Sequence, residues 1–169
     1  MIILKIIIAT IIVGICFMLG MKKSLMYEKR EYILRESINL FKGIENEIRY
    51  MLMELPNAIE STRQNMRTSL KDVLGAISLK LLEPNITFED IYTEIDMLNE
   101  LKPYDKQILT QGIYSLGSTD VEGQMSLIKS TLNTIEVQLK YAIEEKQKNS
   151  KMYKTVGLCA GLMIAIIFI

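Results

Sequence analysis

The sequence contains no histidine, and its 169 residues include only two cysteines and three prolines. Without histidine the usual zinc sites have no support, and Cys16 and Cys159 both lie in apolar segments, so a disulfide framework is not indicated either. The chain has 20 basic and 20 acidic residues, and this balance gives no indication of nucleic acid as a partner. We therefore predict no metal site, no cofactor and no nucleic-acid partner.

The familiar catalytic motifs are missing as well. There is no GxxxxGK[ST] phosphate loop, no GxGxxG, no HExxH and no GxSxG. Glu45 and Glu47 come nearest to a carboxylate pair, but two residues apart on a helix they point to nearly opposite sides. We predict that the protein is not an enzyme. A membrane-bound enzyme stays as the last-ranked alternative, and it would need a pocket that holds a carboxylate of raised pKa.

Uncharged apolar runs occupy both ends of the chain, at residues 6–21 and 155–169. With Lys5 reaching back to the surface, residues 1–21 extend about 32 Å as a helix, enough for a bilayer core of about 30 Å. The C-terminal run reaches only about 22 Å and is borderline. The sequence thus predicts a transmembrane helix at 1–21 and a transmembrane or membrane-inserted helix at 154–169.

Lysines flank both apolar runs on the side that faces the middle of the chain: Lys22 and Lys23 after the first, Lys151 and Lys154 before the second. The positive-inside rule places both flanks in the cytoplasm, which predicts a hairpin topology with residues 22–153 as a cytoplasmic domain. A cleaved signal peptide is the rival interpretation of the start. We favour a retained anchor, because bulky residues crowd the potential cleavage site and a lysine pair follows like a stop-transfer signal.

The middle of the chain has apolar residues at spacings of three and four and no stretch of strict alternation, which predicts an all-α fold, a membrane-anchored bundle of about six helices. A long first helix is expected to extend to about Leu55, and Pro56 suits the first turn of the next. The apolar stripe of the long helix consists of Leu34, Ile38, Phe41, Ile48, Leu52 and Leu55.

Further helix boundaries follow from local signals. A stripe over residues 70–81 ends at the turn signal Pro84-Asn85, and Thr87 is expected to cap a short helix with Asp90 at the capping-box position. Pro103 marks the next start, and Gly117 is placed to end that helix.

The last helix has the strongest periodicity in the chain. Thr119 and Glu122 form the expected capping box at its start. The heptad positions, typical of a coiled coil or of a helix packed on another helix, are Val121, Met125, Ile128, Leu132, Ile135, Leu139 and Ala142. Neither glycine nor proline interrupts residues 139–155, so this helix and the first one are each expected to be continuous with a membrane segment.

Two segments resemble motifs of a known family. Residues 44–50 with 55–59 resemble an "LExEIxY…PLxEAL" segment, and residues 116–124 resemble "LGxSDxEGQ", both typical of the stage III sporulation protein AB family. Asn57-Ala58-Ile59 and Thr119 depart modestly from these patterns. Because size, both apolar ends and the order of the motifs agree too, the resemblance covers the full chain.

The resemblance implies a membrane component of the stage III sporulation complex, which connects mother cell and forespore in endospore-forming bacteria. The soluble domain of the family is similar to the cytoplasmic helical domain of the inner-membrane platform protein of type II secretion and type IV pilus machines. The implied function is a non-enzymatic platform in the mother-cell membrane around the forespore, with its central domain in the cytoplasm. The implied partners are the secretion-type ATPase, stage III sporulation protein AA, and other subunits of the complex.

Most motif residues have an evident local role. The positions we assign to structure are Leu55, Pro56, Leu116, Gly117, Thr119, Asp120, Glu122 and Gly123. Glu47, Tyr50 and Gln124 have no obvious local role in the sequence. The residues we predict for partner binding are therefore Glu45, Glu47, Arg49, Tyr50 and Gln124.

Glu45 is unusual because it occupies a heptad position on an otherwise apolar stripe. Its carboxylate should be paired, either with Arg49 one turn on, or across helices, or with a docked partner. A different function also remains open: a two-anchor membrane scaffold outside sporulation, whose heptad helix associates with a second copy.

Overall fold

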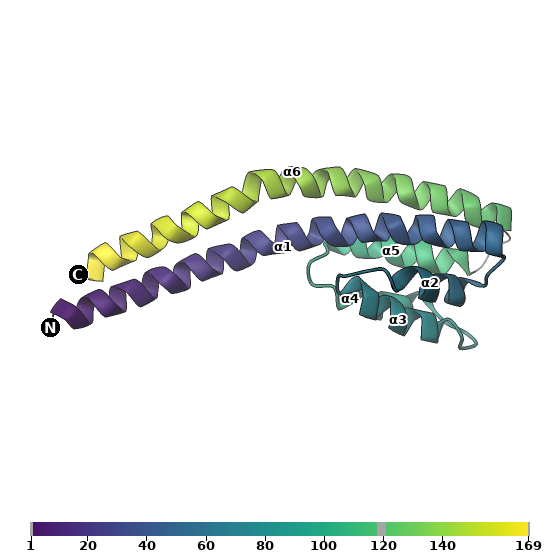
Figure 1. The fold of residues 1–169 in the computed structure, drawn as a ribbon, viewed down its shortest axis with the longest axis horizontal. Helices are drawn as coiled ribbons and strands as arrows, with labels where there is room; N and C mark the ends of the chain where they lie inside the picture. Colours follow the sequence, from purple (N-terminus) through teal and green to yellow (C-terminus); the bar gives the residue numbers. More distant parts are fainter. Residues whose placement is uncertain (1, 118–120, 169) are drawn as a thin grey trace. The chain divides into compact units, whose positions relative to one another are not determined.

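The computed structural model describes residues 2–117 and 121–168, with side chains from Thr10 to Ile166. These parts form six α-helices and no strand (Figure 1), which confirms the predicted all-α fold and its long first and last helices. The helices are α1 Ile2–Met51, α2 Leu55–Arg63, α3 Leu70–Lys80, α4 Phe88–Asp96, α5 Pro103–Leu116 and α6 Val121–Phe168.

The chain forms two compact units, and both long helices contribute to each. The helix-pair unit comprises α1 up to Lys29 and α6 from Tyr141 onward. The central unit comprises Arg30 to Lys140, and therefore holds the rest of α1 and α6 together with the four short helices. The membrane boundaries at 21 and 154 stay predictions.

In the helix-pair unit α1 and α6 run antiparallel and approach closely. A side chain at Gly20 would meet the backbone of Tyr153 and Gly157, and one at Gly161 would meet Val13 and Cys16. Small residues permit such close contact between helices, as they do in membranes, where packing rather than the hydrophobic effect holds helices together. The two helices are thus in direct backbone contact over several turns.

Polar and aromatic contacts continue this pairing toward the middle of the chain. The buried hydroxyls of Ser24 and Ser150 are hydrogen-bonded at 2.5 Å, and the rings of Tyr27 and Tyr153 stack with centroids 5.9 Å apart. Because Gly20 lies against Tyr153 and Gly157, the four flanking lysines lie at one level of the pair. All four are exposed: Lys22, Lys23, Lys151 and Lys154.

The outer faces of the helix pair are apolar. Exposed side chains on α1 include Ile11, Ile15, Phe17, Met18 and Leu19, and those on α6 include Val156, Leu158, Leu162, Met163 and Ile166. Among the described residues, α1 over Thr10–Met51 is the one helix that by length and composition could cross a membrane. A surface of this kind suits lipid rather than water.

The central unit has its hydrophobic core where α2 to α5 gather against α1 and α6 (Figure 1). Helix α1 contributes the most, because its buried residues recur at spacings of three and four and so lie on one face. Fully buried side chains in the unit include Leu34, Leu40, Phe41, Ile44, Ile59, Leu74, Ile77, Ile91, Ile95, Ile113 and Leu116.

A buried ion pair joins α1 to the start of α5. Arg30 donates from Nε to Asp105 Oδ2 at 2.7 Å and from Nη2 to Oδ1 at 3.1 Å, and both side chains are almost fully buried. Arg30 Nη2 also reaches Gln138 Oε1 on α6 at 3.5 Å. Asp105 in turn accepts the backbone N–H of Lys102 at 3.0 Å, so one carboxylate both caps α5 and holds α1.

The predicted helix boundaries at four places are confirmed. Pro56 and Pro103 lie in the first turns of α2 and α5, and α5 ends at Gly117. Thr87 and Asp90 form the reciprocal capping box of α4. The hydrogen bonds from the Thr87 hydroxyl and backbone N–H stabilise the carboxylate and hold the pKa of Asp90 below its usual value.

The end of α1 differs from the prediction. The helix ends at Met51, not near Leu55, because Leu52 adopts the left-handed conformation with φ of 52°. Leu52 is therefore exposed, whereas Leu55 is buried as the first residue of α2. Leucine rarely adopts this conformation, which favours glycine and asparagine, so no residue type at this position indicated a turn.

Candidate partner-binding surface

Four of the five residues predicted for partner binding lie at the α1–α2 corner, which we define as residues 45–54. Arg49 Nη2 forms an ion pair with Glu45 Oε1 at 3.0 Å, one turn apart on α1. This pair confirms the simplest explanation for a carboxylate on the apolar stripe. As a partly exposed helical pair it contributes only a few tenths of a kcal/mol, about 0.3–0.5.

Glu47 lies on the side of α1 that faces α2. Its Oε1 accepts a hydrogen bond from the Ser61 hydroxyl at 3.0 Å. Glu47 therefore has a local role that the sequence did not reveal, because it links α1 to α2. Ser61 on the following helix, 14 positions away, could not have been paired with it from spacing alone.

A polar cleft of about 310 Å³, which we call the acidic cleft, begins at Glu47 and follows α1 and α2. Its lining residues are Glu36, Asn39, Gly43, Glu47, Ser61, Thr62, Asn65 and Met66. At the far end Glu36 accepts the backbone N–H groups of Arg67 at 2.7 Å and Thr68 at 3.2 Å. Among these described lining residues there are two carboxylates and no basic side chain.

Beside the cleft, four consecutive apolar residues project into solvent, and we call residues 50–53 the apolar tip. Tyr50 is 71% exposed, Met51 67%, Leu52 79% and Met53 40%. Of these the sequence prediction included only Tyr50. The sequence does contain a signal for this surface, the four large apolar residues at 50–53, but they were assigned to the predicted long helix.

Gln124 is not part of the α1–α2 corner. Its Nε2 donates to the backbone carbonyl of Leu116 at 2.8 Å, across the connection from α5 to α6. This bond satisfies one of the carbonyls left open at the end of α5. Gln124 therefore has a local structural role, contrary to what the sequence indicated.

The remaining motif residues lie around the same connection. Glu122 is in the first turn of α6, where a carboxylate complements the helix dipole, and Gly123 follows it on the helix. Thr119 and Asp120 lie outside the described residues, and with them the predicted capping box of Thr119 and Glu122.

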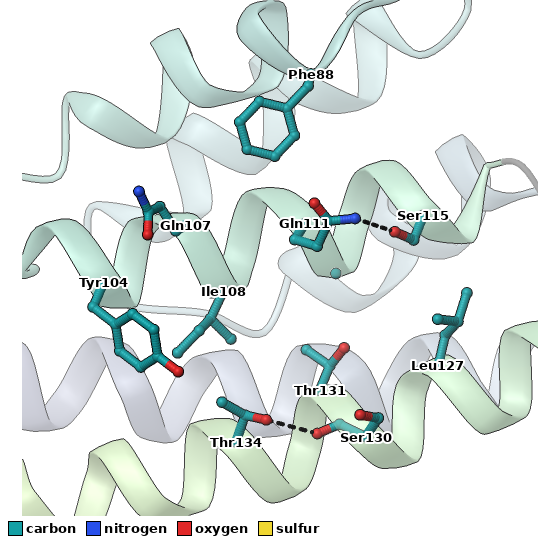
Figure 2. Close-up of a pocket in the computed structure, with 11 residues that line it drawn as sticks. Phe88, Tyr104, Gln107, Ile108, Gln111, Ser115, Leu127, Ser130, Thr131 and Thr134 are labelled. Atoms are coloured by element: carbon teal, nitrogen blue, oxygen red, sulfur yellow. Dashed lines mark hydrogen bonds between the residues drawn. The ribbon is translucent and has the colours of Figure 1, made fainter.

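A second pocket of about 480 Å³ lies among α4, α5 and α6 of the central unit (Figure 2). Its labelled lining residues are Phe88, Tyr104, Gln107, Ile108, Gln111, Ser115, Leu127, Ser130, Thr131 and Thr134. Gln111 Nε2 donates to the Ser115 hydroxyl at 2.7 Å within it. None of these side chains is charged at neutral pH, so the pocket offers neither a carboxylate nor a cation to a substrate.

The heptad stripe of α6 faces inward within the central unit. Ile128 and Ile135 are each about 1% exposed, while Met125 and Leu132 are half-buried. Val121, the first heptad position, is instead 48% exposed. The stripe is thus largely covered by the chain's own helices.

Comparison with known proteins identifies a family over nearly the whole chain. Residues 5–169 match the family described as stage III sporulation protein AB. The protein named "Stage III sporulation protein AB" of Bacillus subtilis (strain 168) is 24% identical over 168 residues, which cover 97% of this chain and 98% of the relative. No solved structure matches the chain. The chain belongs to the stage III sporulation protein AB family.

Proposed function

We propose that this protein is a non-enzymatic membrane platform of the stage III sporulation complex. Family membership supports a role in sporulation. In this proposal both ends are anchored in the mother-cell membrane around the forespore, and the central domain lies in the cytoplasm. There it docks a secretion-type ATPase, stage III sporulation protein AA, and joins the other subunits of the complex.

The topology part of the proposal is supported by the helix pair. Its outer faces are apolar, and its four lysines lie at one level, directly inside the uncharged runs. Clustered lysines at the ends of membrane helices favour the cytoplasmic side. The C-terminal run packs on α1 through Gly157 and Gly161.

The docking part of the proposal is carried by one observation, the α1–α2 corner. The α1–α2 corner combines the exposed apolar tip with neighbouring carboxylates. Exposed apolar clusters bordered by charge are typical of sites that bind other proteins. A platform binds the enzyme that hydrolyses nucleotide, and needs no phosphate loop of its own.

Co-purification of the 169-residue chain, in nanodiscs, with the ATPase tests the proposal. We expect wild-type protein to retain the ATPase and Glu47→Lys to lose most of it, because the change replaces one of the two carboxylates of the acidic cleft by a cation. Glu83→Lys, at an exposed position after α3, is the matched control and should bind normally. No retention by the wild-type protein would refute ATPase docking. Equal retention by both variants would remove Glu47 from the docking surface.

Self-association through the heptad helix remains the alternative function, and the structure gives it little support. The stripe that would mediate it is already covered within the central unit. Light scattering of the protein in nanodiscs of defined size would show a dimer or larger species if a second copy were the main partner.

A further inference from the structure

We propose that the α1–α2 corner is a two-part plug: its apolar tip inserts into an apolar groove of the partner protein, and its acidic cleft receives a lysine or arginine from the groove's rim. This inference rests on the proposed function and deepens it, because it names the chemistry of the partner surface. Leu52 is the anchor of the apolar tip, and Glu47 is the contact for the cation.

The apolar tip is the first support. Tyr50, Met51 and Leu52 are each more than two-thirds exposed, although they follow one another directly in the chain. The exposed apolar residues of the helix pair face the proposed lipid, whereas these belong to the central unit. Tyrosine is among the residue types that most often dominate binding energy at protein interfaces, and methionine adapts its shape to a groove.

The backbone of Leu52 is the second support. A leucine at φ of 52° is in an unfavourable conformation, and glycine or asparagine would fit it without strain. Met53 N–H donates to the carbonyl of Glu47 at 3.2 Å, which closes the turn and holds the backbone of Leu52 so that its side chain is exposed. The side chain is thus already held outward before a partner arrives, which reduces the ordering cost of binding.

The net negative charge of the α1–α2 corner indicates what kind of surface binds there. Residues 45–54 include three carboxylates, Glu45, Glu47 and Glu54, against the single guanidinium of Arg49. A second copy of the same corner would bring like charges together, and an anionic membrane surface would repel it. The surface that fits is a different protein with an apolar groove and a basic rim.

The acidic cleft gives the rim cation a specific place. Its volume of about 310 Å³ exceeds that of one side chain, and amide and hydroxyl groups accompany the carboxylates. Glu47 uses one oxygen for Ser61, and its other oxygen has capacity to accept from an ammonium or guanidinium.

The experiment measures affinity for the ATPase of the proposed function, with the 169-residue chain in nanodiscs. Leu52→Asn keeps a residue that adopts the left-handed turn but removes the apolar side chain. Leu82→Asn removes a comparable leucine, 66% exposed, after α3. We expect Leu52→Asn to weaken binding at least tenfold while its melting temperature stays at or above that of wild type, and Leu82→Asn to bind like wild type.

The cation contact has its own measurement. Glu47→Gln retains an acceptor for the Ser61 hydroxyl but removes the charge, and Asn39→Asp restores a carboxylate to the same cleft. We expect Glu47→Gln to weaken binding and flatten its dependence on salt, and the double variant to recover part of both. Wild-type affinity for Leu52→Asn overturns the apolar anchor, and an unaltered salt dependence for Glu47→Gln overturns the cation contact.

A second measurement distinguishes failure of ATPase docking from failure of the inference about the α1–α2 corner. If wild-type protein does not bind the ATPase, a photo-reactive residue at position 52 or 82 is used in sporulating cells, and the adducts are mapped by mass spectrometry. An adduct from position 52 alone, on an apolar protein surface bordered by basic residues, keeps the inference with another partner. Adducts with lipid or a second copy, equal adducts from both positions, or none, overturn it.

Discussion

Arg30 shows how much a single side chain contributes in this fold. Arg30 follows the lysines after the predicted N-terminal membrane segment, yet the structure buries it with Asp105. A buried charge is tolerated only when its hydrogen-bonding groups find partners, and here both nitrogens that face Asp105 are used in a fork. Loss of one partner leaves the other charged and unsolvated.

We expect Arg30→Met to lower the free energy of unfolding by about 3–5 kcal/mol, because Asp105 would remain buried without its cation. Arg30→Met with Asp105→Asn should recover part of this loss, since asparagine is neutral and still accepts the Lys102 N–H. Chemical denaturation in detergent, followed by circular dichroism, gives the values. Arg35→Met is the control: its pair with Glu31 is half-exposed, and the loss should stay below about 1 kcal/mol.

At this scale, local signals were predictable and distant pairs were not. The Thr87–Asp90 capping box and the proline starts follow from residues within one turn, so their sequence order determines them. The ion pair of Arg30 with Asp105 spans 75 positions and depends on how helices pack. The turn at Leu52 was not predicted for a different reason: its backbone has a positive φ, which leucine rarely adopts.

The element scale is dominated by two helices of 50 and 48 residues, both unbroken. Continuity was predictable, since prolines and glycine pairs are absent at the relevant positions. The element that packs on each long helix was not predictable. Apolar periodicity shows which face of a helix is buried, but it does not show which other element covers that face. In the helix-pair unit the cover is the other long helix, with glycines at the points of closest approach.

This close approach predicts a disulfide. A Cβ atom at Gly161 would lie 3.2 Å from the Cβ of Cys16 and 3.0 Å from the Cα of Val13, so a small outward shift of the helices brings the two Cβ atoms to the separation of about 3.5–4.5 Å that disulfides need. In a Cys159→Ser background, Gly161→Cys should therefore cross-link to Cys16 under mild oxidation. Proteolysis within the central domain, followed by non-reducing electrophoresis, would show the two fragments held together.

Gly14 provides the matched control for this cross-link, because a Cβ atom there meets nothing within 4 Å. A cysteine at position 14, with Cys16 changed to serine and Cys159 retained, should give little product. Efficient cross-linking of the control, or none with Gly161→Cys, would contradict the antiparallel pairing described for these helices.

For the whole molecule, sequence patterns predicted the helical class, the two apolar ends and the family. They did not predict that the surface features would gather at the α1–α2 corner, because that depends on where α1 ends. Each long helix contributes to both the helix-pair unit and the central unit without a break. We infer that a force on the central unit can reach the proposed membrane segments along continuous helix.

Inserting a short Gly-Ser linker next to Lys151 tests this inference. The linker interrupts α6, which otherwise extends from Val121 to Phe168 without a break. We expect sporulation efficiency to fall at least tenfold while protein level and membrane fractionation stay normal. An Ala-rich insertion of equal length, which preserves helix, should have a smaller effect. Normal sporulation with the Gly-Ser linker would count against transmission along α6.

The hydroxyl pair of Ser24 and Ser150 also sets an order of events during synthesis. The two residues are 126 positions apart, whereas the central unit draws only on Arg30 to Lys140. Because a chain is translated from its N-terminus, every residue of the central unit exists before Ser150 is added. The Gly20 and Ser24 face of α1 must therefore wait for its cover until the segment that holds Ser150 leaves the ribosome, so the helix pair closes only after the whole central unit has been translated.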